Sequence, residues 1–167
     1  MAVQPLTIAV VAGVLLVVSI GLDAAINRTY YVDVEQPDGW HQVAAEPVRS
    51  QTFSPIYPAA GGLSVDPNGS ITLRVRLDNG YPWALGETAR LIDQANGTIL
   101  AEKRVDAPAR GEGSAIFTFA ARPYFDRATT ASPPGAKLGP GSVYATLLVE
   151  VGSKTISAYL QLEAVTS

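Results

Sequence analysis

Apolar and polar residues alternate with a period of two along most of the chain after residue 27, which is the pattern of strands with one buried face. The clearest example is Ser70–Asp78, which follows the turn-forming sequence Asp66-Pro67-Asn68-Gly69. Four apolar side chains of this segment are predicted to face a core: Ile71, Leu73, Val75 and Leu77. The polar side chains between them are predicted to face water: Thr72, Arg74, Arg76 and Asp78.

Seven further segments show this alternation, the weakest being Pro47–Phe53. They are Arg28–Glu35, Pro47–Phe53, Glu87–Ala95, Thr98–Val105, Ser114–Ala120, Val143–Val151 and Lys154–Ala164. The pair Asn96-Gly97 predicts a tight hairpin between two of them, because this dipeptide favours the backbone of a two-residue hairpin turn. The pair Gly152-Ser153 predicts a second hairpin at the C-terminus.

No helical periodicity separates these segments, so the helical crossovers that join parallel strands are not expected and the sheets should be antiparallel. Two packed sheets bury both inner faces, whereas one open sheet leaves a face in water. We therefore predict that residues 27–167 form an all-β domain, an immunoglobulin-like antiparallel β-sandwich of seven to eight strands, preceded by one N-terminal apolar helix. The chain has no cysteine, so the disulfide of antibody domains is missing.

Residues 1–26 have a different composition from the rest. Leu6–Leu22 contains no charged residue, and its length is close to the about 20 apolar residues that a membrane-spanning helix needs. We expect an uncleaved, single-pass anchor in the cell membrane. Two alternatives stay open: a signal peptide cleaved after Gly21, which would release a secreted protein, and a hydrophobic helix of a filament.

Three of the four asparagines lie in acceptor sequences for N-glycosylation: Asn27, Asn68 and Asn96. Glycan acceptors favour a domain that stands outside the cytoplasm. The alternative is that Asn-Gly followed by Ser or Thr simply makes a good turn.

Composition and charge argue against several kinds of chemistry. A net charge of −3 with mixed signs gives no basic surface for nucleic acid. One histidine, His41, and no cysteine leave no ligand set for ordinary zinc or copper sites and no catalytic triad beyond one that uses His41. Asp66, Asn68 and Ser70 imitate the start of a calcium loop, but Leu77 stands where the bidentate Glu belongs. We expect neither a metal nor a cofactor and no enzymatic activity.

Two stretches are expected to be irregular: Gln36–Glu46, with Trp40 and His41, and Ala121–Ser142, which is rich in proline and glycine. Aromatic residues in or near loops are the candidates for partner contact: Trp40, Trp83, Tyr124 and Phe125. Tyr81-Pro82-Trp83 would suit a sugar-binding platform, and the alternative is that Trp83 plugs the rim of the core. Tyr124 and Phe125 would otherwise pin a connection to the sandwich.

Two family resemblances can be stated. Residues 70–105 resemble the central hairpin of the late-embryogenesis-abundant, water-stress type of sandwich, although Asp78-Asn79-Gly80-Tyr81-Pro82 replaces that family's Asn-Pro-Asn. The layout of an uncharged helix at Leu6–Leu22 followed by a sandwich with sequons resembles archaeal cell-surface proteins such as pilins, archaellum stator proteins and fibre subunits. The basic residue and glycine of a pilin processing site are missing.

The expected function is a non-catalytic cell-envelope protein, anchored by Leu6–Leu22, whose domain contacts other envelope proteins or copies of itself. One alternative is a structural subunit of an extracellular filament, including a donor-strand fibre in which Thr29–Glu35 would complete the sheet of the next subunit. Another is a glycan-binding surface module that uses Trp40, Trp83 and the long loop.

Overall fold

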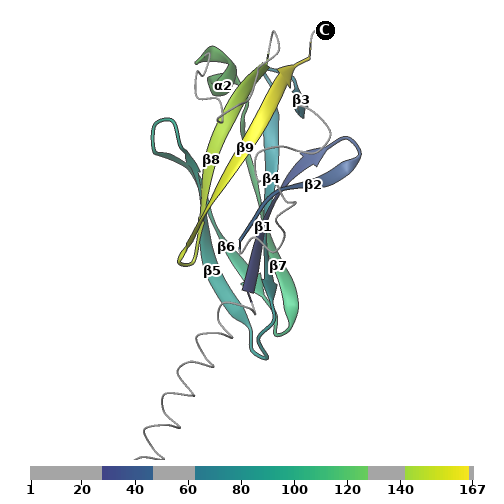
Figure 1. The fold of residues 1–167 in the computed structure, drawn as a ribbon, viewed down its shortest axis with the longest axis vertical. Coiled ribbons are helices and arrows are strands. Elements are labelled where there is room, and N and C mark those ends of the chain that lie inside the picture. The colour runs from purple at the N-terminus through teal and green to yellow at the C-terminus, as the bar shows by residue number, and fades with distance from the viewer. Residues whose placement is uncertain (1–27, 47–62, 128–141, 166–167) are drawn as a thin grey trace, which may run out of the picture.

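The computed structural model describes residues 28–46, 63–127 and 142–165, and these residues form a mostly β structure of two sheets (Figure 1). Sheet A has the strand order β2-β1-β4-β7 and sheet B the order β3-β9-β8-β5-β6. The strands of sheet A are β1 (Arg28–Gln36), β2 (Gly39–Glu46), β4 (Ser70–Asn79) and β7 (Gly111–Ala120). Those of sheet B are β3 (Leu63–Val65), β5 (Leu85–Asp93), β6 (Thr98–Ala107), β8 (Ser142–Val151) and β9 (Lys154–Ala164). A short helix, α2, spans Arg122–Asp126.

Alternating apolar positions build the core, as the sequence predicts. In β4 the side chains of Ile71, Leu73, Val75 and Leu77 are buried, and in β9 the same holds for Ile156, Ala158, Leu160 and Leu162. Tyr30, Val32 and Val34 contribute the inner face of β1. These side chains belong to a single hydrophobic cluster drawn from both sheets, so each sheet covers the apolar face of the other.

Both predicted hairpins are present, with one difference in detail. The β8–β9 hairpin turns at Gly152-Ser153, as expected. The β5–β6 hairpin is wider than the Asn-Gly pair suggests, because β5 ends at Asp93 and a four-residue turn, 94–97, precedes β6. The carboxylate of the buried Asp93 accepts the backbone N–H of Ala95 at 3.0 Å, and this bond stabilises the wider turn. Gly97 adopts a positive φ of 70° there, which glycine does without strain.

Three expectations about the elements were wrong. Residues 36–46 are not irregular: the end of β1 and the whole of β2 form a hairpin, whose register shifts between Val32 and Asp33. The described residues contain nine strands, not seven or eight. The sheets are not wholly antiparallel, because the three-residue β3 runs parallel to β9.

The long C-terminal connection is also more ordered at its start than expected. Residues 122–126 form α2, with Pro123 in its first turn, where a missing N–H costs nothing. The predicted strand Pro47–Phe53, residues 128–141 and the apolar segment Leu6–Leu22 lie outside the described residues.

The two ends of the sandwich differ in what they carry (Figure 1). At one end, called here the Arg28 end, β1 begins and the loops 80–84 and 108–110 join β4 to β5 and β6 to β7. At the other, the far end, lie the turns 66–69 and 94–97, helix α2 and the end of β9. β4 runs from one end to the other, and its ten residues span about 33 Å at a rise of about 3.3 Å per residue.

Candidate interaction surfaces

The outer face of sheet A carries a buried carboxylate at its centre. Asp33 lies on the polar side of β1, yet only 2% of its side chain is exposed. Strand register places it opposite Arg74 of β4, and Arg76 lies two residues further along the same face. Asp33 Oδ2 accepts hydrogen bonds from Arg74 Nε at 3.0 Å and Arg76 Nε at 2.5 Å. A second contact joins Arg76 Nη2 to Asp33 Oδ1 at 3.3 Å.

Two aromatic rings cover the arginines that bind this carboxylate. The Arg74 guanidinium lies 4.5 Å from the ring centroid of Trp40, and that of Arg76 lies 4.6 Å from Tyr31. A guanidinium over an aromatic face is attracted by the ring's quadrupole. The hydrogen bond that Arg76 donates to Asp33 raises the pKa of Arg76, which favours its charged form. We call Asp33, Arg74, Arg76, Trp40 and Tyr31 the arginine–aromatic cluster.

The adjoining strand β7 extends this surface. Ile116, opposite Arg74 in the register, is 47% exposed and is one of the large apolar side chains left in water. Arg76 Nη1 also donates to Glu112 at 2.8 Å, so the positive charges of the cluster are balanced within the face. Trp, Tyr and Arg side chains held in place beside an exposed apolar residue are the composition that dominates protein–protein contacts. The carboxylates of this face, Asp33 and Glu112, are both held by arginine guanidinium groups.

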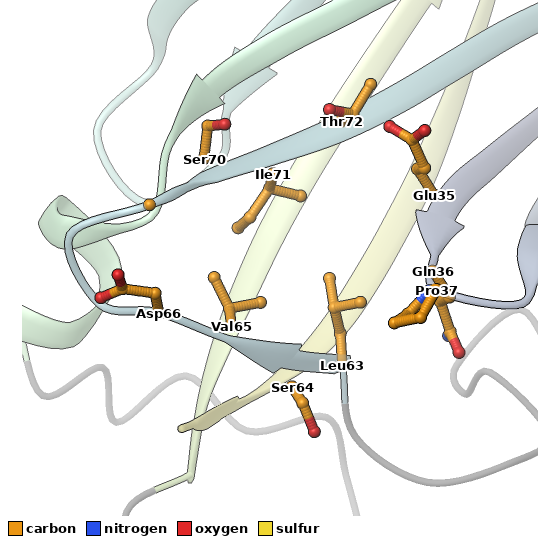
Figure 2. A pocket seen from close by; sticks show the side chains of 11 residues that line it. Glu35, Gln36, Pro37, Leu63, Ser64, Val65, Asp66, Ser70, Ile71 and Thr72 are labelled. Carbon is orange, nitrogen blue, oxygen red and sulfur yellow. The ribbon is translucent and has the colours of Figure 1, made fainter. Parts of the chain in front are cut away.

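A hollow of about 470 Å³ lies between the two sheets near the far end (Figure 2). Its lining residues come from the end of β1 and the turn after it, from β3, and from the β3–β4 turn with the start of β4. Leu63, Val65 and Ile71 point toward one another across its floor, and the carboxylates of Glu35 and Asp66 lie at its rim. β3 is the terminal strand of sheet B on this side.

The carboxylate of Asp66 is hydrogen-bonded within the turn 66–69. Its Oδ1 accepts the backbone N–H of Asn68 at 2.8 Å, and its carbonyl accepts that of Gly69, also at 2.8 Å. Within residues 28–46, 63–127 and 142–165, no three His, Cys, Asp or Glu side chains gather as a metal site would require. The hollow is therefore a small cleft of mixed polar and apolar lining, with two carboxylates among its lining residues.

A third surface lies at the Arg28 end, in the loop 80–84. The side chain of Asn79 is fully buried and holds this loop: Nδ2 donates to the carbonyls of Trp83 and Pro108, each at 2.8 Å. Its Oδ1 accepts the N–H of Tyr81 at 3.0 Å. The rings of Tyr81 and Trp83 stack with centroids 4.8 Å apart, and Trp83 is 56% exposed. Trp83 is therefore not a plug of the core. We call the two rings the aromatic platform.

Arg28 connects the start of β1 to this end of the molecule. Its guanidinium lies 5.9 Å from the Tyr81 ring and donates to Glu87 of β5 at 2.8 Å. The hydroxyl of Tyr30 donates to the other oxygen of the same carboxylate at 2.8 Å. Burial, together with the hydrogen bond to Glu87, raises the pKa of Tyr30. These bonds join sheet A to sheet B and fix where the first strand starts.

The four aromatic candidates lie in three separate places. Trp40 belongs to the arginine–aromatic cluster and Trp83 to the platform, near opposite ends of the sandwich. Tyr124 is 2% exposed and meets the ring of Phe119 edge-on at 5.8 Å, while Phe125 packs partly buried against the core. Both residues of α2 thus pack against the sandwich.

The remaining sequence candidates lie on the surface. Asn68 and Asn96 are exposed in the two far-end turns, and the Oδ1 of Asn68 accepts a bond from Arg122 at 3.1 Å. Asn27 lies outside the described residues. His41 is half-buried on the edge strand β2, with Nε2 2.7 Å from Asp38. Sequence reasoning missed three residues of the arginine–aromatic cluster: Asp33, Arg74 and Arg76. The alternating pattern predicts which side chains point outward, but it does not predict which of them lie next to each other on neighbouring strands.

Comparison with protein-family models finds no family that matches this chain, and comparison with curated proteins finds no similar sequence. The described part of the chain contains no helix of the length and hydropathy that crossing a membrane requires.

Proposed function

We propose that the protein is a non-catalytic component of the cell envelope, held in the membrane by Leu6–Leu22, whose domain outside the cytoplasm contacts other proteins. On this proposal the two sheets form an immunoglobulin-like sandwich, and the outer face of sheet A is the contact surface. The proposal agrees with the archaeal cell-surface layout that the sequence resembles.

The observation that carries the proposal is that the start of the domain and the two described glycan-acceptor residues lie at opposite ends of the sandwich. Six residue steps separate Leu22 from Arg28, and an extended chain covers at most about 3.6 Å per residue, so the Arg28 end lies within roughly 22 Å of the apolar segment. The glycan acceptors Asn68 and Asn96 lie on exposed turns at the far end. An anchored domain would therefore direct both acceptors away from the bilayer.

Cysteine labelling tests the membrane topology directly, because the chain has no cysteine of its own. A cysteine at the exposed far-end position Gln94 should react with a membrane-impermeant maleimide on intact cells. The matched variant Ala2→Cys, on the other side of Leu6–Leu22, should react only after permeabilisation. Labelling of Gln94→Cys only after permeabilisation would place the domain in the cytoplasm and refute the proposal.

Site-specific photo-crosslinking tests the contact surface. A photoreactive amino acid at Ile116 should give a discrete adduct in cells, since this exposed apolar side chain borders the arginine–aromatic cluster. The control is Thr155, which is exposed on β9 of the other sheet. Equal adduct yields at both positions would remove the assignment of the outer face of sheet A.

The filament alternative is constrained by the sheet topology. β1 lies between β2 and β4 and is paired with both, so donation of Thr29–Glu35 to another subunit would require two ladders to open. Electron microscopy of cell surfaces tests for filaments built through Leu6–Leu22 instead. A glycan site that combines Trp40 with Trp83 would need two residues that the fold keeps apart.

A further inference from the structure

The aromatic platform exposes the most apolar surface at the Arg28 end. Trp83 is 56% exposed, more than any other large apolar side chain in the described residues. The ring of Trp83 stacks on that of Tyr81, with centroids 4.8 Å apart. An exposed indole stacked on a second ring presents an apolar body with a polar N–H at its edge, which suits a place where an apolar phase meets water.

The platform is held rigidly, unlike an ordinary loop tip. Asn79 supplies three hydrogen bonds from a fully buried side chain, and the N–H of Arg110 donates to the carbonyl of Tyr81 at 2.8 Å. Both loops of the Arg28 end are therefore tied together. A preorganised pair of rings loses little conformational entropy when it binds, which favours a binding role.

Chain length indicates what lies opposite this surface. Arg28 is 5.9 Å from the Tyr81 ring, and only residues 23–27 separate it from Leu22. The headgroup layer of a bilayer is about 5–8 Å thick on each side, so five residues suffice to cross it but do not carry the domain far away. The platform is thus confined to the neighbourhood of the headgroups if Leu6–Leu22 spans the membrane.

The chemistry of the platform matches that environment. Tryptophan and tyrosine gather where a bilayer meets water, because their rings enter the acyl boundary while the N–H or O–H stays hydrated. Arg110 is exposed on the neighbouring loop and can meet lipid phosphates. Arg28 is bound to Glu87 and adds no free charge.

We propose that Tyr81 and Trp83 form a second membrane contact, which inserts into the headgroup region of the bilayer that holds Leu6–Leu22 and fixes the orientation of the domain. This inference rests on the proposed function, since it requires the apolar segment to be in the membrane. The sandwich then stands on its Arg28 end, and the outer face of sheet A faces sideways, along the membrane surface.

The two tryptophans give a matched pair of probes. Trp40→Phe leaves Trp83 as the single tryptophan, and Trp83→Phe leaves Trp40. Trp40 pairs with Glu35, seven residues along β1 from Arg28, which places it about 23 Å from the Arg28 end at about 3.3 Å per residue. Both full-length variants are reconstituted into vesicles of phosphatidylcholine and phosphatidylglycerol, with or without a nitroxide on the lipid headgroup.

Co-flotation with the vesicles is measured first and reports on the anchor alone. The expected result is that both variants float, that the headgroup nitroxide quenches Trp83 but not Trp40, and that Trp83 emission shifts to the blue in vesicles. Flotation without quenching of Trp83 would overturn the inference and leave the anchor intact. Failure of both variants to float would overturn the proposed function.

A further measurement separates lipid from other occupants of the platform. Acrylamide in the aqueous phase should quench Trp40 more than Trp83 in vesicles. Protection of Trp83 from acrylamide without quenching by the lipid nitroxide would indicate a second copy of the chain on the platform. Protection that appears only when sugars are added would indicate a glycan site. Either outcome refutes the membrane contact.

Discussion

Replacement of Asp33 by asparagine tests the buried centre of the outer face. The substitution keeps the size of the side chain but removes the charge that binds Arg74 and Arg76. Loss of one partner from a fully buried ion pair costs about 3–5 kcal/mol, because the other charge is left without compensation. Here the arginine side chains remain 26% and 20% exposed, so water can solvate part of the freed charge. We therefore expect a loss of about 2–3 kcal/mol.

The measurement is the free energy of unfolding of full-length variants in urea, with a thermal melt as a second readout. For a domain of this size, 2–3 kcal/mol lowers the melting temperature by roughly 6–12 °C. The matched control is Asp78→Asn, an exposed carboxylate on the polar side of β4, which should stay within about 0.5 kcal/mol of the parent. A loss for Asp33→Asn no larger than that of the control would show that the cluster adds nothing to stability, and the reasoning would fail.

Three further predictions concern the core and its polar groups. Tyr124→Phe should leave stability unchanged or raise it by up to about 1 kcal/mol, because the buried Tyr124 hydroxyl has no hydrogen-bond partner among the described residues. Tyr30→Phe should lower stability by about 0.5–1.5 kcal/mol, because it removes the hydrogen bond to Glu87. Urea unfolding of both variants measures the two changes. Burial raises the pKa of both tyrosines, so unfolded chains lose these protons from about pH 10 upward while the folded protein keeps them, and the free energy of unfolding should fall above that pH; a double Phe variant that falls as steeply would contradict this. Gly113→Ala should cost about 1–3 kcal/mol, because its Cβ would clash with the backbone oxygen of Asp106, whereas the exposed Ser114→Ala should be nearly neutral in the same assay.

The strands that could be predicted from sequence are those with strict alternation. β4 and β9 each bury every second residue, so their bounds and inner faces follow from period alone. β2 was missed, because its buried pair Val43 and Ala44 is consecutive and its other residues, Trp40 apart, are poor strand formers. Pairing with β1 makes it a strand. β3 has three residues, which is too few to show a periodic pattern. Its parallel pairing with β9 depends on where the chain lies in the folded structure.

The candidate surfaces show the same division. Trp40 and Trp83 could be nominated from sequence as aromatic residues near predicted loops. The sequence could not predict that Trp40 covers Arg74 above the buried Asp33. These residues belong to β2, β4 and β1, and only the register of the strand pairs brings them together. The role of Asn79 as the support of the aromatic platform likewise depends on Pro108, which is distant in sequence and adjacent in space.

The sequence alone determined the all-β class, the two hairpins, the inner face of each regular strand and the absence of charge from Leu6–Leu22, because these properties depend on residue type and local period. The tertiary structure decided which polar residues meet, which aromatic side chains stay in water and what each end of the sandwich carries. Those properties depend on strand order and register, and contacts between residues as distant as Arg28 and Glu87 exist only once the two sheets are packed together.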